Sequence, residues 1–434
     1  MKYVIIGNSA AGINAAEAIR GVDSEGEIVV ISDEDLHAYS RCLTSYFVEG
    51  SVSEEEMDFR PKDFYEKHKI TSMLGVRVEQ VLSDEKQLRL SDGGSVGYDK
   101  LLIATGGTPK KQGIPGEDKQ GVHTLRTLPD AKGIVSLLKD TKVAAVLGGG
   151  LIGMKIAHAV HHNDVDVKVI VKSNRILSQM VDEDAAKLLR KVVEDNGIEV
   201  MTGLAATEVL GEKKVTGLKL DDGSTIESQL VIVGKGVNAN MDLVKGTDIK
   251  CEYGIIVNDH VRTSVPDVYA AGDVAQTYDL ARGETWTNAM WPCAAEQGRI
   301  AGLNMAGQDA VYHGSMGMNS IQLFGVPAIS MGITRPRGEE YEILTSEGVD
   351  TYRKVVLKDN RVVGMIVVGK VENSGVLGVL MRKQVDVSEI KPLLLREDFD
   401  YAKIAPLVHK EVGAFKESEF RRTVESYSPE AVAK

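Results

Sequence analysis

The feature that most constrains this chain is a succession of apolar strand, glycine-rich turn, helix and second strand that occurs twice. In the first copy, the apolar segment 2–6 leads into Gly7-Asn8-Ser9-Ala10-Ala11-Gly12, a helix through residue 20 and a strand at 29–31. In the second copy, the segment 143–147 leads into Gly148-Gly149-Gly150-Leu151-Ile152-Gly153, a helix through residue 160 and a strand at 167–171. Units of this kind build parallel sheets covered by helices. The sequence therefore predicts an α/β fold with two such sheets.

The two turns also predict a ligand. Glycines at these places let the backbone approach a pyrophosphate, whose charge then sits at a helix N-terminus. The second turn has all three glycines of Gly-x-Gly-x-x-Gly, whereas Ser9 replaces the middle glycine of the first. Either turn alone could lack a ligand, but two in one chain favour two dinucleotide sites. The expected contacts are Gly7, Ser9, Ala10, Ala11 and Gly12 in the first site, and Gly148, Gly150, Leu151, Ile152 and Gly153 in the second.

Charge and cysteine content exclude several classes of protein. The chain has 434 residues, 43% of them hydrophobic, which is enough for a large buried core. Its 51 lysines and arginines against 63 acids give a net charge of −12, which argues against a nucleic-acid or anionic-membrane surface. Three cysteines are too few for a disulfide scaffold and fit a reducing compartment. With no visible leader and no run of about 18 apolar residues, the chain is expected in the cytoplasm.

Further segments carry a resemblance to a known family. Ala104-Thr105-Gly106-Gly107 follows an apolar strand, and Thr263-Ser264-Val265-Pro266-Asp267-Val268-Tyr269-Ala270-Ala271-Gly272-Asp273 forms a second motif. With the two turns in this order, the chain resembles the pyridine nucleotide–disulfide oxidoreductase superfamily of flavoproteins. The resemblance implies FAD and NAD(P)H as cofactors, with hydride passing from the nicotinamide to the flavin.

The resemblance also implies a domain organisation. Two Rossmann-like dinucleotide-binding domains are expected, one inserted in the other, followed by a C-terminal α+β domain. The FAD domain would comprise residues 1–108 and 236–310, and the NAD(P) domain residues 109–235. Residues 311–434 would form the α+β interface or dimerisation domain, whose polar end, Thr423 to Lys434, is expected to fray.

The resemblance assigns further contacts to FAD. Asp273, beside Gly272, would hydrogen-bond the ribityl chain, although an N-cap or turn aspartate is the plainer alternative. Ala104, Thr105 and Gly106 would line the crossing segment, and Gln297 belongs to a helix whose N-terminus would face the flavin pyrimidine. Two acids, Asp33 and Glu34, compete for the adenosine ribose, and Asp33 is our first choice.

The stretch Tyr39-Ser40-Arg41-Cys42-Leu43-Thr44-Ser45-Tyr46 resembles two branches of the superfamily. In the ferredoxin, rubredoxin and nitrite reductase-like branch, Arg41 would lie near the FAD phosphates. In the single-cysteine coenzyme A disulfide reductases, Cys42 would be the redox thiol beside the flavin. A low thiol pKa would need a cation, which Arg41 or a helix end could supply. Leu43 replaces the glycine expected after a redox cysteine, and a packing role for Cys42 stays open.

Two lysines depart from the pattern of the superfamily. Lys155 stands where many relatives carry a glutamate near the nicotinamide, and it is either a site contact or a solvent-facing helix residue. Lys172 stands where an acid would hold the ribose 2′-hydroxyl and could tolerate a 2′-phosphate instead. Because relatives that lack the acid still use NADH, we expect NADH as the donor.

The resemblance leaves two electron acceptors open. Segments 361–369 and 372–375 resemble the nitrite and rubredoxin reductase-like branch and the NADH-linked flavin subunits of phenylglyoxylate dehydrogenase-type complexes. This favours transfer of electrons to a redox protein or to iron–sulfur subunits of a larger complex, in either direction. The alternative is a disulfide or persulfide reductase that uses Cys42, and a chain that acts alone would form a homodimer.

A histidine cluster is the remaining candidate for chemistry. His158, His161 and His162 lie on the helix after the second turn. No carboxylate or cysteine completes a metal-binding set, so we expect a solvated helix face and no metal.

Overall fold

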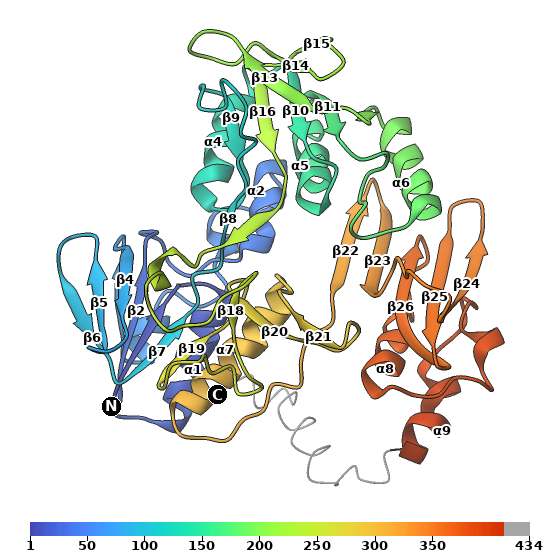
Figure 1. Ribbon diagram of the computed structural model, residues 1–434. Helices are drawn as coiled ribbons and strands as arrows, with labels where there is room; N and C mark the ends of the chain where they lie inside the picture. Colours follow the sequence, from blue (N-terminus) through green and yellow to red (C-terminus); the bar gives the residue numbers. More distant parts are fainter. Residues whose placement is uncertain (412–434) are drawn as a thin grey trace. The chain divides into compact units, whose positions relative to one another are not determined.

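The computed structural model describes residues 1–411 and has two compact units, residues 1–326 and the part that begins at Pro327 (Figure 1). The segment predicted to fray, Thr423 to Lys434, lies outside the described residues. None of the helices in the described part combines the length and the apolar character that a membrane crossing requires. The domain limits proposed at residues 108, 235 and 310 remain predictions.

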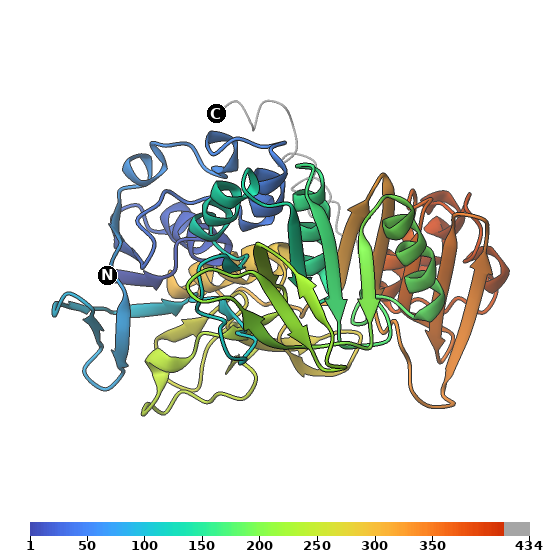
Figure 2. The ribbon, with the colours of Figure 1, turned by 90° about the horizontal axis from the view of Figure 1, so that it is seen from above.

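The first unit contains two parallel five-stranded sheets. The first has the order β19-β7-β1-β2-β3, and its strands are Val268–Ala270, Lys100–Ile103, Lys2–Ile6, Glu27–Ser32 and Ile70–Leu74. The second has the order β12-β11-β10-β16-β9, and its strands are Glu199–Thr202, Asp166–Val171, Val143–Leu147, Leu230–Val233 and Val122–Thr124. In Figure 2 the strands of the second sheet, blue-green to light green, run side by side. The predicted α/β fold with two parallel sheets is confirmed.

The two sheets repeat one topology. Each has a central strand, β1 or β10, followed by a helix that leads to the neighbouring strand; the helix is α1 (Ala10–Val22) in the first sheet and α5 (Leu151–His161) in the second. Each also has a three-stranded antiparallel sheet inserted in the chain, just before β7 in the first sheet and just before β16 in the second. These small sheets consist of β4 (Val78–Leu82), β5 (Gln87–Leu90) and β6 (Ser95–Gly97), and of β13 (Ala206–Leu210), β14 (Gly217–Leu220) and β15 (Thr225–Glu227). The central strands are buried almost throughout, which explains their continuous apolar sequences.

The remaining elements of the first unit lie outside the two parallel sheets and their small antiparallel sheets. The helices are α2 (Thr44–Glu49), α3 (Phe64–Lys67), α4 (Leu128–Leu138), α6 (Glu183–Asp195) and α7 (Trp291–Met305), with 3-10 turns η1 (Arg41–Leu43), η2 (Glu55–Met57) and η3 (Asp242–Val244). The strands are β8 (Gly107–Pro109), β17 (Val237–Ala239), β18 (Ile255–Ile256), β20 (Ala275–Asp279), β21 (Glu284–Trp286) and β22 (Met318–Leu323).

Helices α1 and α7 lie side by side although they are far apart in the sequence (Figure 1). Two glycines of α7 allow this approach. A Cβ at Gly298 would lie 2.0 Å from the carbonyl oxygen of Ala11, and one at Gly302 would lie 2.3 Å from that of Ala15. The backbones of the two helices are therefore in contact, and α7 is fixed against the helix that follows the first glycine turn.

The last glycine of each turn has no room for a side chain. A Cβ at Gly12 would lie 1.9 Å from the Gly7 carbonyl oxygen, and one at Gly153 would lie 1.8 Å from that of Gly148. Gly150 differs, because it has an ordinary φ of −80° and no atom within 4 Å of a built Cβ.

We expect Gly153→Ala to destabilise the fold by roughly 3 kcal/mol, the upper range for overpacking, because the colliding atom belongs to the backbone. Gly150→Ala should change stability by less than about 0.5 kcal/mol. Melting temperatures of the two purified variants test this, and equal values would contradict the tight contact at Gly153.

The second unit is an antiparallel sheet with helices. Strands β23 (Val326–Gly332), β26 (Arg361–Val368), β25 (Tyr352–Lys358) and β24 (Tyr341–Glu347) follow one another in this spatial order. Helices α8 (Gly375–Lys383) and α9 (Tyr401–Glu411) follow β26 in the chain, with the 3-10 turn η4 (Lys391–Leu393) between them. This agrees with the predicted C-terminal α+β domain.

Candidate functional site

The two glycine turns have the same local structure at the carboxyl ends of β1 and β10. Gly7 and Gly148 have positive φ angles of 125° and 120°, which side-chain-bearing residues rarely adopt. Ser9 and Gly150 are the N-caps of α1 and α5, and neither helix has a side-chain hydrogen bond at its cap. The first amides of both helices thus lack the usual side-chain acceptor, an arrangement that suits an anion.

The space around the second turn fits a ligand. No protein atom lies within 4 Å of a Cβ built at Gly150, so the turn leaves open space at this position. A bound pyrophosphate would use that space. Ser9 occupies the equivalent position of the first turn, also in an extended conformation, so its side chain meets no backbone strain there.

Asp273 forms an ion pair that the sequence did not reveal. Its carboxylate lies 2.7 Å from Nη2 of Arg126, and both side chains are mostly buried. The Nε atom of Arg126 is buried and has no hydrogen-bond partner among the described residues. A buried, unpaired N–H costs free energy unless an acceptor reaches it, so this pair fits a bound polar group between β19 and the segment before α4.

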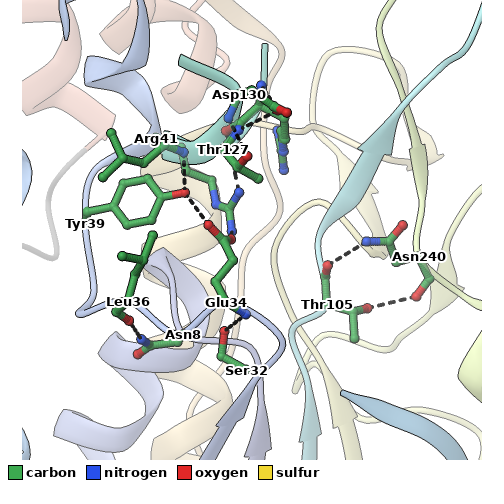
Figure 3. Close-up of polar contacts among 12 residues, drawn as sticks. Asn8, Ser32, Glu34, Leu36, Tyr39, Arg41, Thr105, Thr127, Asp130 and Asn240 are labelled. Carbon is green, nitrogen blue, oxygen red and sulfur yellow. Dashed lines mark hydrogen bonds and ion pairs between the residues drawn. The ribbon is translucent and has the colours of Figure 1, made fainter. Parts of the chain in front are cut away.

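A second network lies where β2 ends (Figure 3). Glu34 accepts a hydrogen bond of 2.6 Å from the hydroxyl of Tyr39 and forms an ion pair with Arg41. The Tyr39 hydroxyl in turn accepts from the Leu128 amide at 3.0 Å. Asp33 is exposed, whereas the Glu34 side chain is largely buried. The geometry thus favours Glu34 over Asp33 as the acid that would hold the adenosine ribose. Arg41, expected near the FAD phosphates, forms its ion pair with Glu34.

The segment after β7 and the segment after β17 are joined by hydrogen bonds between Thr105 and Asn240 (Figure 3). The Thr105 hydroxyl donates to the Asn240 carbonyl at 2.8 Å, and the Asn240 amide group donates to the Thr105 carbonyl at 3.0 Å. Gly106 follows with a φ of 64°, and a Cβ there would lie 3.4 Å from Nη2 of Arg126. The predicted segment Ala104–Gly106 therefore lies beside the Arg126–Asp273 pair.

Gln297 lies next to Asp273, and its side chain forms hydrogen bonds to other parts of the protein. Its Oε1 accepts from the Gly272 amide at 2.8 Å, and its Nε2 donates to the hydroxyls of Thr277 and Tyr312. The residue is 1% exposed. Its side chain therefore fixes the backbone beside Asp273 instead of facing a ligand.

Comparison with known proteins decides the family. The family model described as pyridine nucleotide-disulphide oxidoreductase matches residues 1–293. The chain belongs to this family. A second model, described as the rubredoxin NAD+ reductase C-terminal domain, matches residues 318–385. Members of the family bind FAD and depend on NAD(P)H, so the chain is a flavin-dependent oxidoreductase, as predicted.

Individual relatives are named as redox proteins. The chain is 34% identical to the NADH-dependent phenylglyoxylate dehydrogenase subunit epsilon of Aromatoleum evansii, over 86% of this chain and 90% of that one. It is 30% identical to the assimilatory nitrate reductase electron transfer subunit of Bacillus subtilis, over 86% of this chain but only 48% of that longer protein. The crystal structure of NADH:rubredoxin oxidoreductase from Clostridium acetobutylicum matches with a TM-score of 0.76 and 28% identity, covering 90% of this chain and 97% of that one.

The cations that lower the pKa of the Cys42 thiol are Lys155 and, with a smaller effect, Arg126. Arg41, one of the two expected sources of positive charge, forms its ion pair with Glu34 instead. Cys42 is exposed in η1, yet desolvation by the surrounding protein raises the pKa of its thiol, and the charge of Lys155 opposes the shift. The ammonium of Lys155 lies 5.7 Å from the ring centroid of Tyr46, and the side chain is half-buried. Lys155 is therefore not a fully solvated lysine of the helix surface, which was one of the two roles considered for it.

The histidine cluster differs from the expectation. The rings of His158 and His161 pack against Phe324, with centroids 4.7 Å and 5.9 Å apart. Burial lowers the pKa of His158, and Glu49 opposes the shift. This helix face is therefore not solvated, and of the three histidines only His162 is exposed. Within residues 1–411 no group of three or more His, Cys, Asp or Glu side chains is placed to hold a metal ion.

Proposed function

We propose that this chain carries electrons between a nicotinamide dinucleotide and a protein redox partner. The observation that carries the proposal is the repeated turn geometry, in which two helices of one unit present uncapped N-termini at the carboxyl ends of β1 and β10. Ligands of open parallel sheets bind at this edge. When bound, FAD and NAD(P)H together supply hydride transfer and the release of electrons.

Different residues of the chain would bind FAD and the nicotinamide nucleotide. The turn Gly7–Gly12 and the Arg126–Asp273 pair would hold the FAD pyrophosphate and ribityl regions, with Gln297 positioning the backbone beside Asp273. The turn Gly148–Gly153 would hold the pyrophosphate of the nicotinamide nucleotide. Glu34 is the acid best placed for the adenosine ribose, because Tyr39 and Arg41 fix its carboxylate at the end of β2.

The names of the relatives support a protein acceptor. One relative is named as an NADH:rubredoxin oxidoreductase. Two others are named as subunits of phenylglyoxylate dehydrogenase and of nitrate reductase. We therefore infer that the partner of this chain is a small redox protein or an iron–sulfur subunit, and that a chain without such a partner forms a homodimer. Three free cysteines fit a reducing location such as the cytoplasm.

Anaerobic stopped-flow mixing tests the proposal. The FAD-loaded protein should be reduced by NADH, and the reduced protein should then transfer electrons to oxidised rubredoxin or a two-cluster ferredoxin. Coenzyme A disulfide serves as the competing acceptor. Fast reduction of the disulfide and none of either protein would contradict the proposal.

The competing function, a disulfide or persulfide reductase, would need a reactive thiolate at Cys42. Because desolvation raises the pKa of this thiol, less thiolate is present near neutral pH than for an ordinary cysteine. We expect the rate of Cys42 alkylation by iodoacetamide, followed by mass spectrometry, to rise with pH and to reach its midpoint at a higher pH than that of free cysteine. Lys155→Met should move the midpoint further up, since the ammonium favours the thiolate. A wild-type midpoint below about 7.5 would instead support the redox thiol.

A further inference from the structure

One tyrosine hydroxyl joins the first glycine turn to the loop that follows β2. Tyr65, in α3, donates a hydrogen bond from its hydroxyl to Oδ1 of Asn8 at 2.8 Å, and the same oxygen accepts one from the Ala38 amide at 3.2 Å. Asn8 is the second residue of the turn, and Ala38 lies four residues after Glu34. The hydroxyl therefore acts as donor to one segment and as acceptor from the other, and both segments are expected to contact FAD.

Asn8 adds a second link between the same two segments. Its Nδ2 donates to the carbonyl oxygen of Leu36 at 3.1 Å (Figure 3). The backbone adds a third link at the start of the turn, where the Gly7 amide donates to the Ile31 carbonyl at 2.8 Å. Both polar ends of the Asn8 side chain thus have partners within the protein, and they hold the turn in a fixed position relative to the loop.

The link extends from Ala38 to the acid of this loop. The next residue is Tyr39, whose hydroxyl donates to the Glu34 carboxylate at 2.6 Å. The ring of Tyr65 is itself held in place, because it packs edge-on against the ring of His37 with 5.2 Å between the centroids. The position of the Glu34 carboxylate therefore depends on a loop that Tyr65 fixes at its middle.

One FAD molecule would have to meet both segments at once, with its pyrophosphate on the turn and its adenosine ribose on Glu34. Two segments that are already held at the right separation lose less conformational entropy on binding. We propose that Tyr65 is a positioning residue for FAD, which sets the register between the turn Gly7–Gly12 and the loop that carries Glu34. This inference rests on the proposed function and assigns a role to a residue outside the glycine motifs.

A matched tyrosine separates positioning from stability. Tyr3 lies in β1, the strand that leads into the turn, and its hydroxyl donates to the Asp23 carboxylate at 2.9 Å. It lies near the amino end of that strand, whereas ligands of parallel sheets bind at the carboxyl ends. Tyr3→Phe and Tyr65→Phe each remove one hydroxyl that donates to a neighbouring side chain, so both should lower the melting temperature.

Equilibrium dialysis of the FAD-loaded protein, followed by flavin absorbance, measures the dissociation constant for FAD. Tyr65→Phe should weaken FAD binding about tenfold, because the turn and the loop are then ordered only when FAD binds. Tyr3→Phe should leave the dissociation constant unchanged. Asn8→Ala breaks the same link from the side of the turn and should weaken binding to a similar extent.

A double-mutant cycle tests whether Tyr65 acts through the acid. In the Glu34→Gln background, Tyr65→Phe should change the dissociation constant by about twofold or less, because the carboxylate that the loop positions is already absent. An undiminished effect in this background would overturn the inference.

The remaining outcomes separate this inference from the proposed function. Equal affinities of Tyr65→Phe and the wild-type protein for FAD would overturn the inference alone. A loss of affinity in Tyr3→Phe as large as in Tyr65→Phe would also overturn it, because both residues would then act through stability. The proposed function fails separately, if NADH does not reduce the FAD-loaded wild-type protein or if the reduced protein passes no electrons to a protein acceptor.

Discussion

Gly150→Glu is expected to slow reduction of the flavin by NADH strongly while the protein stays folded and yellow. The new side chain has free space in the protein itself, with no atom within 4 Å of its Cβ, so the fold is not strained. It would instead occupy the place of the pyrophosphate and oppose its negative charge. We expect the second-order rate constant of reduction to fall on the order of a hundredfold, about 2.7 kcal/mol.

A charge control separates the site from a general effect. Gly21 lies in α1, is exposed and also has no atom within 4 Å of a built Cβ. Gly21→Glu adds the same charge away from the second turn and should leave the rate of reduction unchanged. Stopped-flow absorbance measures the rate of flavin reduction by NADH in both variants. Reduction of the Gly150→Glu protein at the wild-type rate would contradict the assignment of the second turn to the nicotinamide site.

Asp273→Ala is expected to weaken FAD binding. The substitution removes the carboxylate expected on the ribityl chain and leaves the buried guanidinium of Arg126 without its partner. Loss of one hydrogen bond that involves a charged group costs roughly 2 kcal/mol, which is about a thirtyfold weaker affinity. Flavin absorbance per chain after extensive dialysis measures the effect.

Asp267 provides the matched control. It precedes the other end of the same strand, β19, where it pairs with Lys86 and Lys100 at the amino edge of the sheet. Asp267→Asn should retain FAD even if it lowers the melting temperature, because ligands bind at the carboxyl edge. Equal loss of flavin from both variants would mean that Asp273 acts through stability alone.

The two parallel sheets and the glycine turns could be predicted from the sequence because the patterns that identify them each lie within a few neighbouring residues. The central strands Lys2–Ile6 and Val143–Leu147 have the predicted bounds, since each is a continuous apolar run that ends at a glycine. The glycine turns were visible for the same reason, because their spacing within six residues defines the motif.

The partners of the site residues could not be predicted in this way. Arg126 is 147 residues from Asp273, and Thr105 is 135 residues from Asn240. No periodicity in the chain reports contacts at such separations, which depend on how the two sheets are connected. Cys42 illustrates the consequence: its neighbour in sequence, Arg41, is paired with Glu34, and the cation with the largest effect on the thiol, Lys155, comes from α5.

The contact between α1 and α7 sets an order of assembly during synthesis. All strands of the second sheet lie within residues 122–233, so they have been translated before β19 and α7 exist. The first sheet, although it begins at Lys2, lacks its edge strand until Ala270, and α1 lacks the helix that covers Ala11 and Ala15 until Gly302. Since domains fold as units while the chain emerges from the ribosome, the second sheet can complete its core first, and the first sheet completes its own only near the end of translation.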